Sequence, residues 1–135
     1  MQGPSDTIGT YIRAKDGNRP HMMRRAFAEG AALEIVVNTD TISFPASATG
    51  LDSITDILVR RFSDDFENVY TFCLVSPPLS DERRFRCDWL VGMSAKAGGD
   101  LRVGCGSYDW FFQTGDRCLV ERLEITVERM QVLPA

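Results

Sequence analysis

The order of helical and strand-like patterns limits the folds open to this chain more than any single motif does. Short helical stretches fill the front half and alternate with a brief strand pair, whereas long strand-like runs fill the back half. Long strands that follow one another through short turns form antiparallel meanders. The sequence therefore predicts a small cone-shaped α+β domain, in which a curved sheet wraps around helices and leaves a pocket.

Three segments in the front half place apolar residues at helical spacing. The first carries Tyr11 on its apolar stripe and ends at the break in residues 16–18. The second starts near Pro20, where a missing N–H does no harm, and ends at Gly30. The third covers residues 51–62. We expect all three helices to pack against the sheet.

The strands are expected in two groups. A short pair covers residues 32–37 and 41–44, and a meander follows over residues 68–75, 84–93, 101–113 and 118–132, with turns at 98–100 and 114–116. In residues 84–93, alternation puts Cys87 and Trp89 on a core face and Arg86 and Asp88 on the opposite face. That opposite face is solvent, a dimer interface or a pocket wall, and alternation alone does not choose among them.

Length and charge limit the partners. At 135 residues we expect one domain over residues 1–135. A net charge of −4 disfavours nucleic acid as the main partner, because phosphate binding needs a basic face. The alternative would be a basic stripe built from Arg60, Arg61, Arg83 and Arg84.

The four cysteines, Cys73, Cys87, Cys105 and Cys118, lie among apolar residues and form no C-x-x-C pair. We interpret them as reduced core thiols rather than metal ligands, which fits a cytoplasmic protein. The chain shows no secretory signal and no apolar run long enough to span a membrane. We therefore expect neither a metal nor an organic cofactor, and no membrane partner.

Three groups of residues together resemble nuclear transport factor 2-like proteins, the cystatin-like cone group that includes SnoaL-like domains. They are residues 11–16 followed by 27–31, residues 50–54, and residues 106–108 with an aromatic residue beyond. The resemblance implies a cystatin-like cone with three N-terminal helices on a curved, mostly antiparallel sheet. It also implies an apolar pocket for a small hydrophobic molecule and a homodimer formed through the sheet.

This group holds isomerases, dehydratases, polyketide cyclases and epoxide hydrolases as well as binding and scaffold members, so the fold does not fix the function. The isomerase base position falls on Ile35, which cannot act as a base. Dehydratase-like and dehydrochlorinase-like relatives pair an Asp after the first helix with a His. Asp16 matches that Asp, but the His position falls near Glu67 or Asn68, and His21 is the chain's one histidine. The plain alternative for Asp16 is a helix-ending turn residue.

Resemblance to limonene epoxide hydrolase implies the most complete catalytic set. Arg86 and Asp88 match its Arg-x-Asp, and Glu124 falls near its second acid. Two carboxylates bridged by an Arg would have separated pKa values, as acid–base chemistry needs. The alternative is an ion pair on the surface of a strand.

We therefore name Asp88, Arg86, Glu124 and Tyr11 as the candidate catalytic residues, with Tyr11 as a hydrogen-bond donor. The candidate ligand contacts are Trp89, Tyr108, Trp110 and Ile35, and their alternative role is core packing. The expected function is a small-molecule-binding domain that is either a cofactor-free acid–base enzyme or a non-catalytic binding or dimerisation module.

Overall fold

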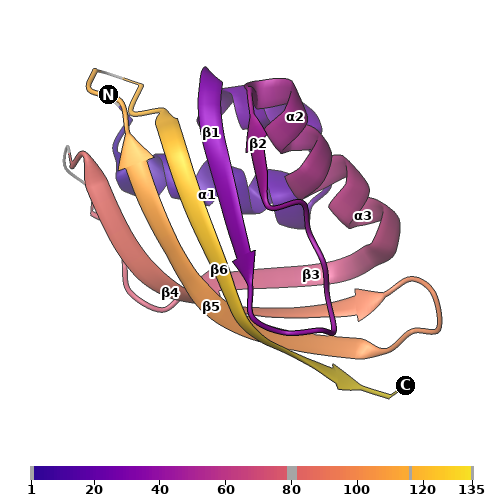
Figure 1. The fold of residues 1–135 in the computed structure, drawn as a ribbon. Helices are drawn as coiled ribbons and strands as arrows, with labels where there is room; N and C mark the ends of the chain where they lie inside the picture. Colours follow the sequence, from indigo (N-terminus) through magenta and orange to yellow (C-terminus); the bar gives the residue numbers. More distant parts are fainter. Residues whose placement is uncertain (1, 79–81, 116, 135) are drawn as a thin grey trace.

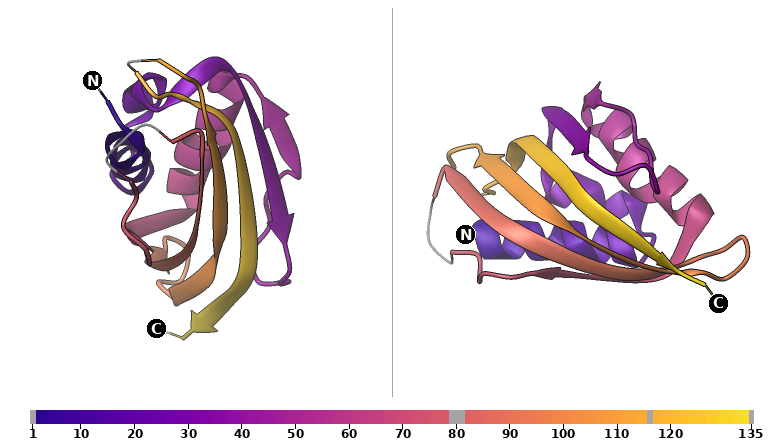
Figure 2. Two further views of the ribbon diagram at one scale, coloured as in Figure 1. Left: turned by 90° about the vertical axis from the view of Figure 1, so that its left-hand side faces the viewer. Right: turned by 60° about the horizontal axis from the view of Figure 1, so that its bottom comes forward.

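The computed structural model describes residues 2–78, 82–115 and 117–134. It is an α+β structure in which six strands form one mixed sheet in the order β2-β1-β6-β5-β4-β3. The helices lie on the concave side of this sheet, which curls around them (Figures 1 and 2). The side chains between the helices and the concave face form the hydrophobic core.

The first helix, α1 (Pro4–Asp16), confirms the first helical pattern. Its N-cap residue is Gly3. Asp6 Oδ2 accepts a hydrogen bond from the Gly3 backbone N–H at 3.1 Å. The buried stripe includes Ile8, Tyr11 and Lys15, which are spaced three and four residues apart.

The second helical prediction is wrong in its second half. A 3-10 helix, η1 (Pro20–Arg25), replaces the expected longer helix, and strand β1 (Phe27–Val37) already begins at Phe27. The reason is tertiary: Phe27 is buried and pairs with Val120, whose N–H donates to the Ala26 carbonyl at 2.7 Å. Sheet pairing therefore overrides the helical spacing of residues 26–30.

The partner of β1 is also not where the pattern puts it. The short strand β2 is Ser47–Thr49, and residues 41–44 form no strand. Instead Ile42 and Phe44 turn their side chains into the core. Pro45 has no N–H to donate to a ladder, so pairing with β1 resumes only beyond it, where the Ile35 N–H donates to the Ala46 carbonyl.

The third helical pattern is confirmed as a continuous helical stretch. It consists of α2 (Leu51–Thr55), a wider π-helical turn η2 (Asp56–Arg61) and α3 (Phe62–Asp65). Its buried face carries Ile54, Leu58 and Phe62. This stretch lies on the concave side of the sheet, beside β1 and β2 at its α2 end (Figure 1).

The meander is confirmed with small shifts of its ends. The strands are β3 (Phe66–Cys73), β4 (Arg84–Ala95), β5 (Leu101–Phe112) and β6 (Val120–Leu133). Neighbours in this series are antiparallel, whereas β1 runs parallel to β6. The turn predicted at residues 114–116 includes Asp116, which lies outside the described residues.

A bulge in the β5–β6 pair sits between Cys105 and Gly106. A Cβ on Gly106 would overlap the Thr126 carbonyl and approach the Trp89 ring to 2.8 Å, so the close contact of these strands needs a glycine there. Beyond the bulge, Tyr108, Trp110 and Phe112 all point to the concave face and are buried.

Candidate functional site

A small cavity lies between the concave face of the sheet and the helices. Its volume is about 50 Å³, and its walls are mainly aromatic and aliphatic. A water molecule needs roughly 10–15 Å³ by the same kind of measure, so the space suits a group of a few non-hydrogen atoms. The lining residues are Tyr11, Lys15, Ile35, Ile42, Phe44, Leu58, Phe62, Thr71, Trp89, Val91, Met93, Tyr108, Ile125, Val127 and Met130.

The expected ligand contacts divide according to this cavity. Trp89, Tyr108 and Ile35 line it, and so does Tyr11. Trp110 is fully buried behind them, where its ring packs on Tyr11 at 5.4 Å and Tyr108 at 5.1 Å between centroids. The structure therefore brings three of the four predicted contacts to the cavity and places Trp110 in the packing that supports it.

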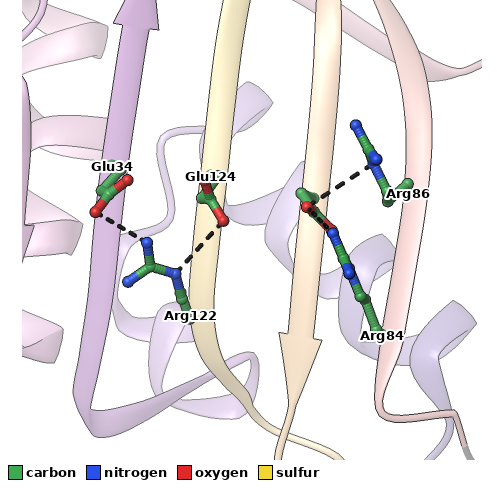
Figure 3. Close-up of polar contacts among 6 residues, drawn as sticks. Glu34, Arg84, Arg86, Arg122 and Glu124 are labelled. Carbon is green, nitrogen blue, oxygen red and sulfur yellow. Dashed lines mark hydrogen bonds and ion pairs between the residues drawn. The ribbon is translucent and has the colours of Figure 1, made fainter.

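The charged candidates lie elsewhere. Arg86 and Asp88 point to the outer face of β4, opposite the cavity, and Glu124 points to the outer face of β6. Figure 3 shows Arg86 and Glu124 within a ladder of charges that crosses the outside of the sheet. Of the three positions that alternation left open, the structure excludes the pocket wall, so these three residues do not reach the cavity.

The expected pairing of Arg86 with Asp88 is also corrected. Arg86 Nε lies 3.8 Å from Asp109 Oδ2, on the neighbouring strand. Arg86 and Asp109 stand directly opposite each other in the β4–β5 register. Side chains directly opposite are nearer than side chains two residues apart on one strand, so the cross-strand partner is the one reached.

A polar cluster that the sequence did not reveal stands at one end of the cavity. Lys15 Nζ lies 2.8 Å from Asp16 Oδ1 and donates to Thr71 Oγ1 at 2.7 Å. Asp16 also accepts from the Thr71 backbone N–H at 2.7 Å and from the Thr71 hydroxyl at 2.8 Å. Asp16 is thus more than a turn residue, because it joins the end of α1 to β3.

Of these three residues, Lys15 and Thr71 line the cavity. The Lys15 side chain is 9% exposed, and its Nζ lies 4.9 Å from the centre of the Phe62 ring. Burial lowers the pKa of Lys15, and the neighbouring Asp16 carboxylate opposes that effect. The cluster therefore offers the cavity an amine whose charge is costly to keep.

The spacing along α1 could have identified Lys15. It lies seven residues after Ile8 and four after Tyr11, on the buried stripe of that helix. The His position of the dehydrochlorinase-like relatives falls near Glu67 or Asn68, whereas the structure bonds Asp16 to Thr71, further along β3. Asn68 has a φ of 54° beside the irregular pairing of β3, and beyond it Val69 and Thr71 face inward.

Two tyrosines complete the polar lining. The Tyr11 and Tyr108 rings meet edge to face, with 6.1 Å between their centroids. Burial is the main cause that raises the pKa of both phenols well above the ordinary value. Both are therefore neutral hydrogen-bond donors at physiological pH.

One further donor lies in the wall. The indole Nε1 of Trp89 is buried and has no hydrogen-bond partner among the described residues. A buried N–H without an acceptor is costly, and a ligand oxygen is one way to satisfy it.

The described residues contain no group of three or more His, Cys, Asp or Glu side chains that could hold a metal ion. His21 is exposed on η1. In the described part of the chain, no helix is long and apolar enough to cross a membrane.

No protein-family model matches this sequence, and no protein of established description matches it either. Solved structures do resemble it over almost its whole length. One is a nuclear transport factor 2-like superfamily protein from Salmonella enterica serovar Typhimurium. It is 11% identical with a TM-score of 0.74, and the match covers 97% of this chain and 88% of that one.

Two others are an enzyme and a designed binding protein. The hexachlorocyclohexane dehydrochlorinase LinA-type3 from Novosphingobium barchaimii is 9% identical with a TM-score of 0.70, covering 95% of this chain and 86% of that one. A computationally designed 17-OHP binder is 12% identical with a TM-score of 0.70, and the match covers 98% of this chain and 99% of that one. One fold thus carries both an enzyme and a binder, and this chain has that nuclear transport factor 2-like fold.

Proposed function

We propose that this protein binds a small, largely apolar molecule in the cavity beneath its sheet and acts on it by acid–base chemistry with its own side chains. The observation that carries this proposal is the contrast within the cavity lining. The lining is aliphatic and aromatic, and it also includes Lys15, Tyr11 and Tyr108, which carry an amine and two hydroxyls. Apolar pockets with a few convergent polar groups are the usual form of small-molecule sites.

The polar side chains in and beside the cavity have different roles in this proposal. Lys15 is the group that takes up or releases a proton, because burial brings its pKa down. Asp16 and Thr71 are positioning residues that hold its Nζ through the contacts at 2.8 and 2.7 Å. Tyr11 and Tyr108 stay neutral and stabilise negative charge that develops on a ligand oxygen. Isomerisation, dehydration and cyclisation all fit these roles.

The small volume of the cavity restricts the ligand. Binding pockets for drug-sized molecules measure roughly 300 Å³ or more, against about 50 Å³ here. Ile42 and Phe44, from the segment between β1 and β2, form part of the wall and are partly exposed. We therefore expect either a ligand of a few non-hydrogen atoms or one end of a larger molecule that enters past these two residues.

The test compares two neighbouring positions of β4. Val91→Phe fills the cavity, whereas Leu90→Phe adds the same group on the outer face. Ligands from a panel of short ketones, alcohols and enones are detected by shifts in the NMR signals of Trp89. We expect Val91→Phe to remove binding and Leu90→Phe to keep it. Met93→Ala, which enlarges the cavity, should strengthen binding, and equal behaviour of all three variants would exclude this site.

The rival function, a non-catalytic binding module, predicts a different result with the same panel. A catalyst exchanges ligand protons with solvent deuterium, and Lys15→Met lowers that exchange rate by at least tenfold. A pure binding protein gives binding without exchange.

We also propose that the protein forms a homodimer through the outer face of its sheet. Four exposed apolar residues, Tyr70, Phe72, Leu90 and Val103, gather over β3, β4 and β5. Phe72 stands opposite Leu90 in the register, so the apolar surface is continuous across strands. Sedimentation equilibrium should give twice the chain mass of 15.1 kDa, and Phe72→Lys should return a monomer. A monomeric wild-type protein would rule out this assembly.

A further inference from the structure

Lysine is rare in this chain, and one of its two copies lies in the cavity. The sequence contains thirteen arginines and two lysines, Lys15 and Lys96. Lys96 is exposed in the turn after β4. Among the described residues, the one cation in the cavity lining is thus of the type that can lose its proton, since arginine stays charged in proteins.

The surroundings of Lys15 Nζ leave part of it available to a ligand. An ammonium group has three N–H donors. Within the described part of the chain, the polar partners of Nζ are Asp16 Oδ1 at 2.8 Å and Thr71 Oγ1 at 2.7 Å, and the Phe62 ring lies beside it. Lys15 lines the cavity and Asp16 does not, so the carboxylate holds Nζ from the side of the cluster that lies away from the cavity lining.

An amine in a dry pocket is a nucleophile toward carbonyl carbon. We propose that Lys15 binds aldehydes or ketones covalently, as an imine between Nζ and the carbonyl carbon of an apolar ligand. This proposal rests on the proposed binding function, to which it adds the ligand class. Trp89, Tyr11 and Tyr108 line the same cavity, and their N–H and hydroxyl groups are of the kind that suits a carbonyl oxygen or the carbinolamine hydroxyl.

The reaction balances without a co-reactant. Nζ gives up a proton, and its lone pair forms a bond to the carbonyl carbon while the oxygen takes up a proton. The carbon–oxygen bond of this carbinolamine then breaks, water leaves with a second proton, and a C=N bond forms. An ammonium ion and a carbonyl compound thus become a protonated imine and water.

The overall charge does not change in this reaction. A protonated imine is as positive as the ammonium ion that it replaces, so Asp16 keeps a cation beside it at 2.8 Å. Separating a buried carboxylate from its partner would cost several kcal/mol, and imine formation avoids that cost. Burial lowers the pKa of Lys15 and so increases the fraction of neutral amine, which is the form that starts the reaction.

Reductive trapping tests the proposal. The full chain is incubated with propanal and cyanoborohydride, and the modified amines are located by peptide mass mapping. Reduction of the imine adds the mass of the aldehyde minus one oxygen atom. At neutral pH, we expect Lys15 to be modified at least tenfold faster than Lys96 or the N-terminal amine. Modification of Lys15 no faster than Lys96 would overturn the proposal.

Two variants supply the controls. Lys96→Arg should keep the modification, whereas Lys15→Arg preserves the charge but cannot form an imine and should lose it. Propanol, which cannot form an imine, is tested for binding in parallel. Binding of propanol without trapping at Lys15 defeats the imine proposal alone. Absence of both binding and trapping defeats the proposed function as well.

Discussion

The two faces of this sheet come from alternate residues of the same strands, yet different forces hold them. On the concave face, Trp110 is fully buried among aromatic rings. One residue earlier, Asp109 belongs to the outer face, where Arg84 Nη2 lies 2.8 Å from it but is itself 55% exposed. Apolar burial stabilises the first face, and screened ion pairs link the strands on the second.

The outer face also shows why charged residues in strands are poor evidence of catalysis. Glu34, Glu124 and Asp109 stand side by side in the register of β1, β6 and β5. Like charges directly opposite destabilise a sheet, and here arginines offset them: Arg122 lies 2.9 Å from Glu34 and 3.5 Å from Glu124 (Figure 3). Arg, Asp and Glu at a spacing of two can thus form such a ladder on a wet surface.

The largest expected effect comes from comparing neighbouring positions on β5. Trp110→Ala removes a fully buried ring and should lower the free energy of unfolding by about 3–5 kcal/mol. Asp109→Ala should cost only a small fraction of that. Urea unfolding followed by circular dichroism measures both. Equal losses would mean that the outer ladder contributes to stability as much as the core does.

Period-two alternation is why much of the fold was predictable from the sequence. It assigned Cys87 and Trp89 to one face and Arg86 and Asp88 to the other, and the structure agrees. Alternation cannot say which face is covered by helices, so the resemblance to an epoxide hydrolase placed the acids wrongly. The failures at Phe27 and Ile42 have another cause, because partners distant in sequence decide those segments.

Lys15 escaped prediction for a different reason. A lysine one residue before a helix end usually interacts with the helix dipole and solvent. Its burial depends on Thr71, which is 56 residues away and supplies an acceptor at 2.7 Å. No local pattern contains that contact, although the position of Lys15 on the apolar stripe was visible.

The next largest effect concerns the ion pair of Lys15 and Asp16, which lies beside the otherwise apolar concave face. Asp16→Asn removes the charge beside Lys15, whose side chain is 9% exposed, and should cost about 3 kcal/mol because it leaves a buried cation uncompensated. Adding Lys15→Met to this variant should restore part of the loss, since the cation is then gone. The free energies of unfolding of both single variants and the double variant form a thermodynamic cycle. Strictly additive losses would show that the two side chains do not interact.

A smaller effect distinguishes buried from exposed tyrosines. Tyr11 and Tyr108 have a raised pKa in the folded protein, so the folded state keeps protons that the unfolded state loses above its ordinary phenol value of 10.0. Stability is then full below that pH and falls as the pH rises further, by about 1.4 kcal/mol per pH unit for each tyrosine. Urea midpoints should therefore fall steeply in alkali.

Lys15 has the opposite effect on the pH dependence of stability, and this effect lies in a lower pH range. Its folded-state pKa is lowered, so its contribution to stability improves with rising pH up to its ordinary value of 10.5 and then stays constant. The slope of the free energy of unfolding against pH is therefore measured above pH 10.5, where Lys15 no longer contributes to it. Tyr11→Phe should reduce it, whereas Tyr70→Phe, at a side chain that is 65% exposed, should leave it as in the wild type. An unchanged slope in Tyr11→Phe would show that this phenol does not control alkaline unfolding.

The smallest expected effect is on the outer ladder itself. Glu124→Gln removes the middle carboxylate of three while Arg122 keeps its 2.9 Å contact with Glu34. Lost attraction and lost repulsion offset each other, so the free energy of unfolding should change by no more than about 0.5 kcal/mol. The change should vanish in about 1 M salt, where the Debye length is roughly 3 Å. Ligand binding should also stay unchanged, because Glu124 lies on the opposite side of the sheet from the cavity. A loss of binding in this variant would mean that the two faces are coupled through β6, and the separation of their roles would then be wrong.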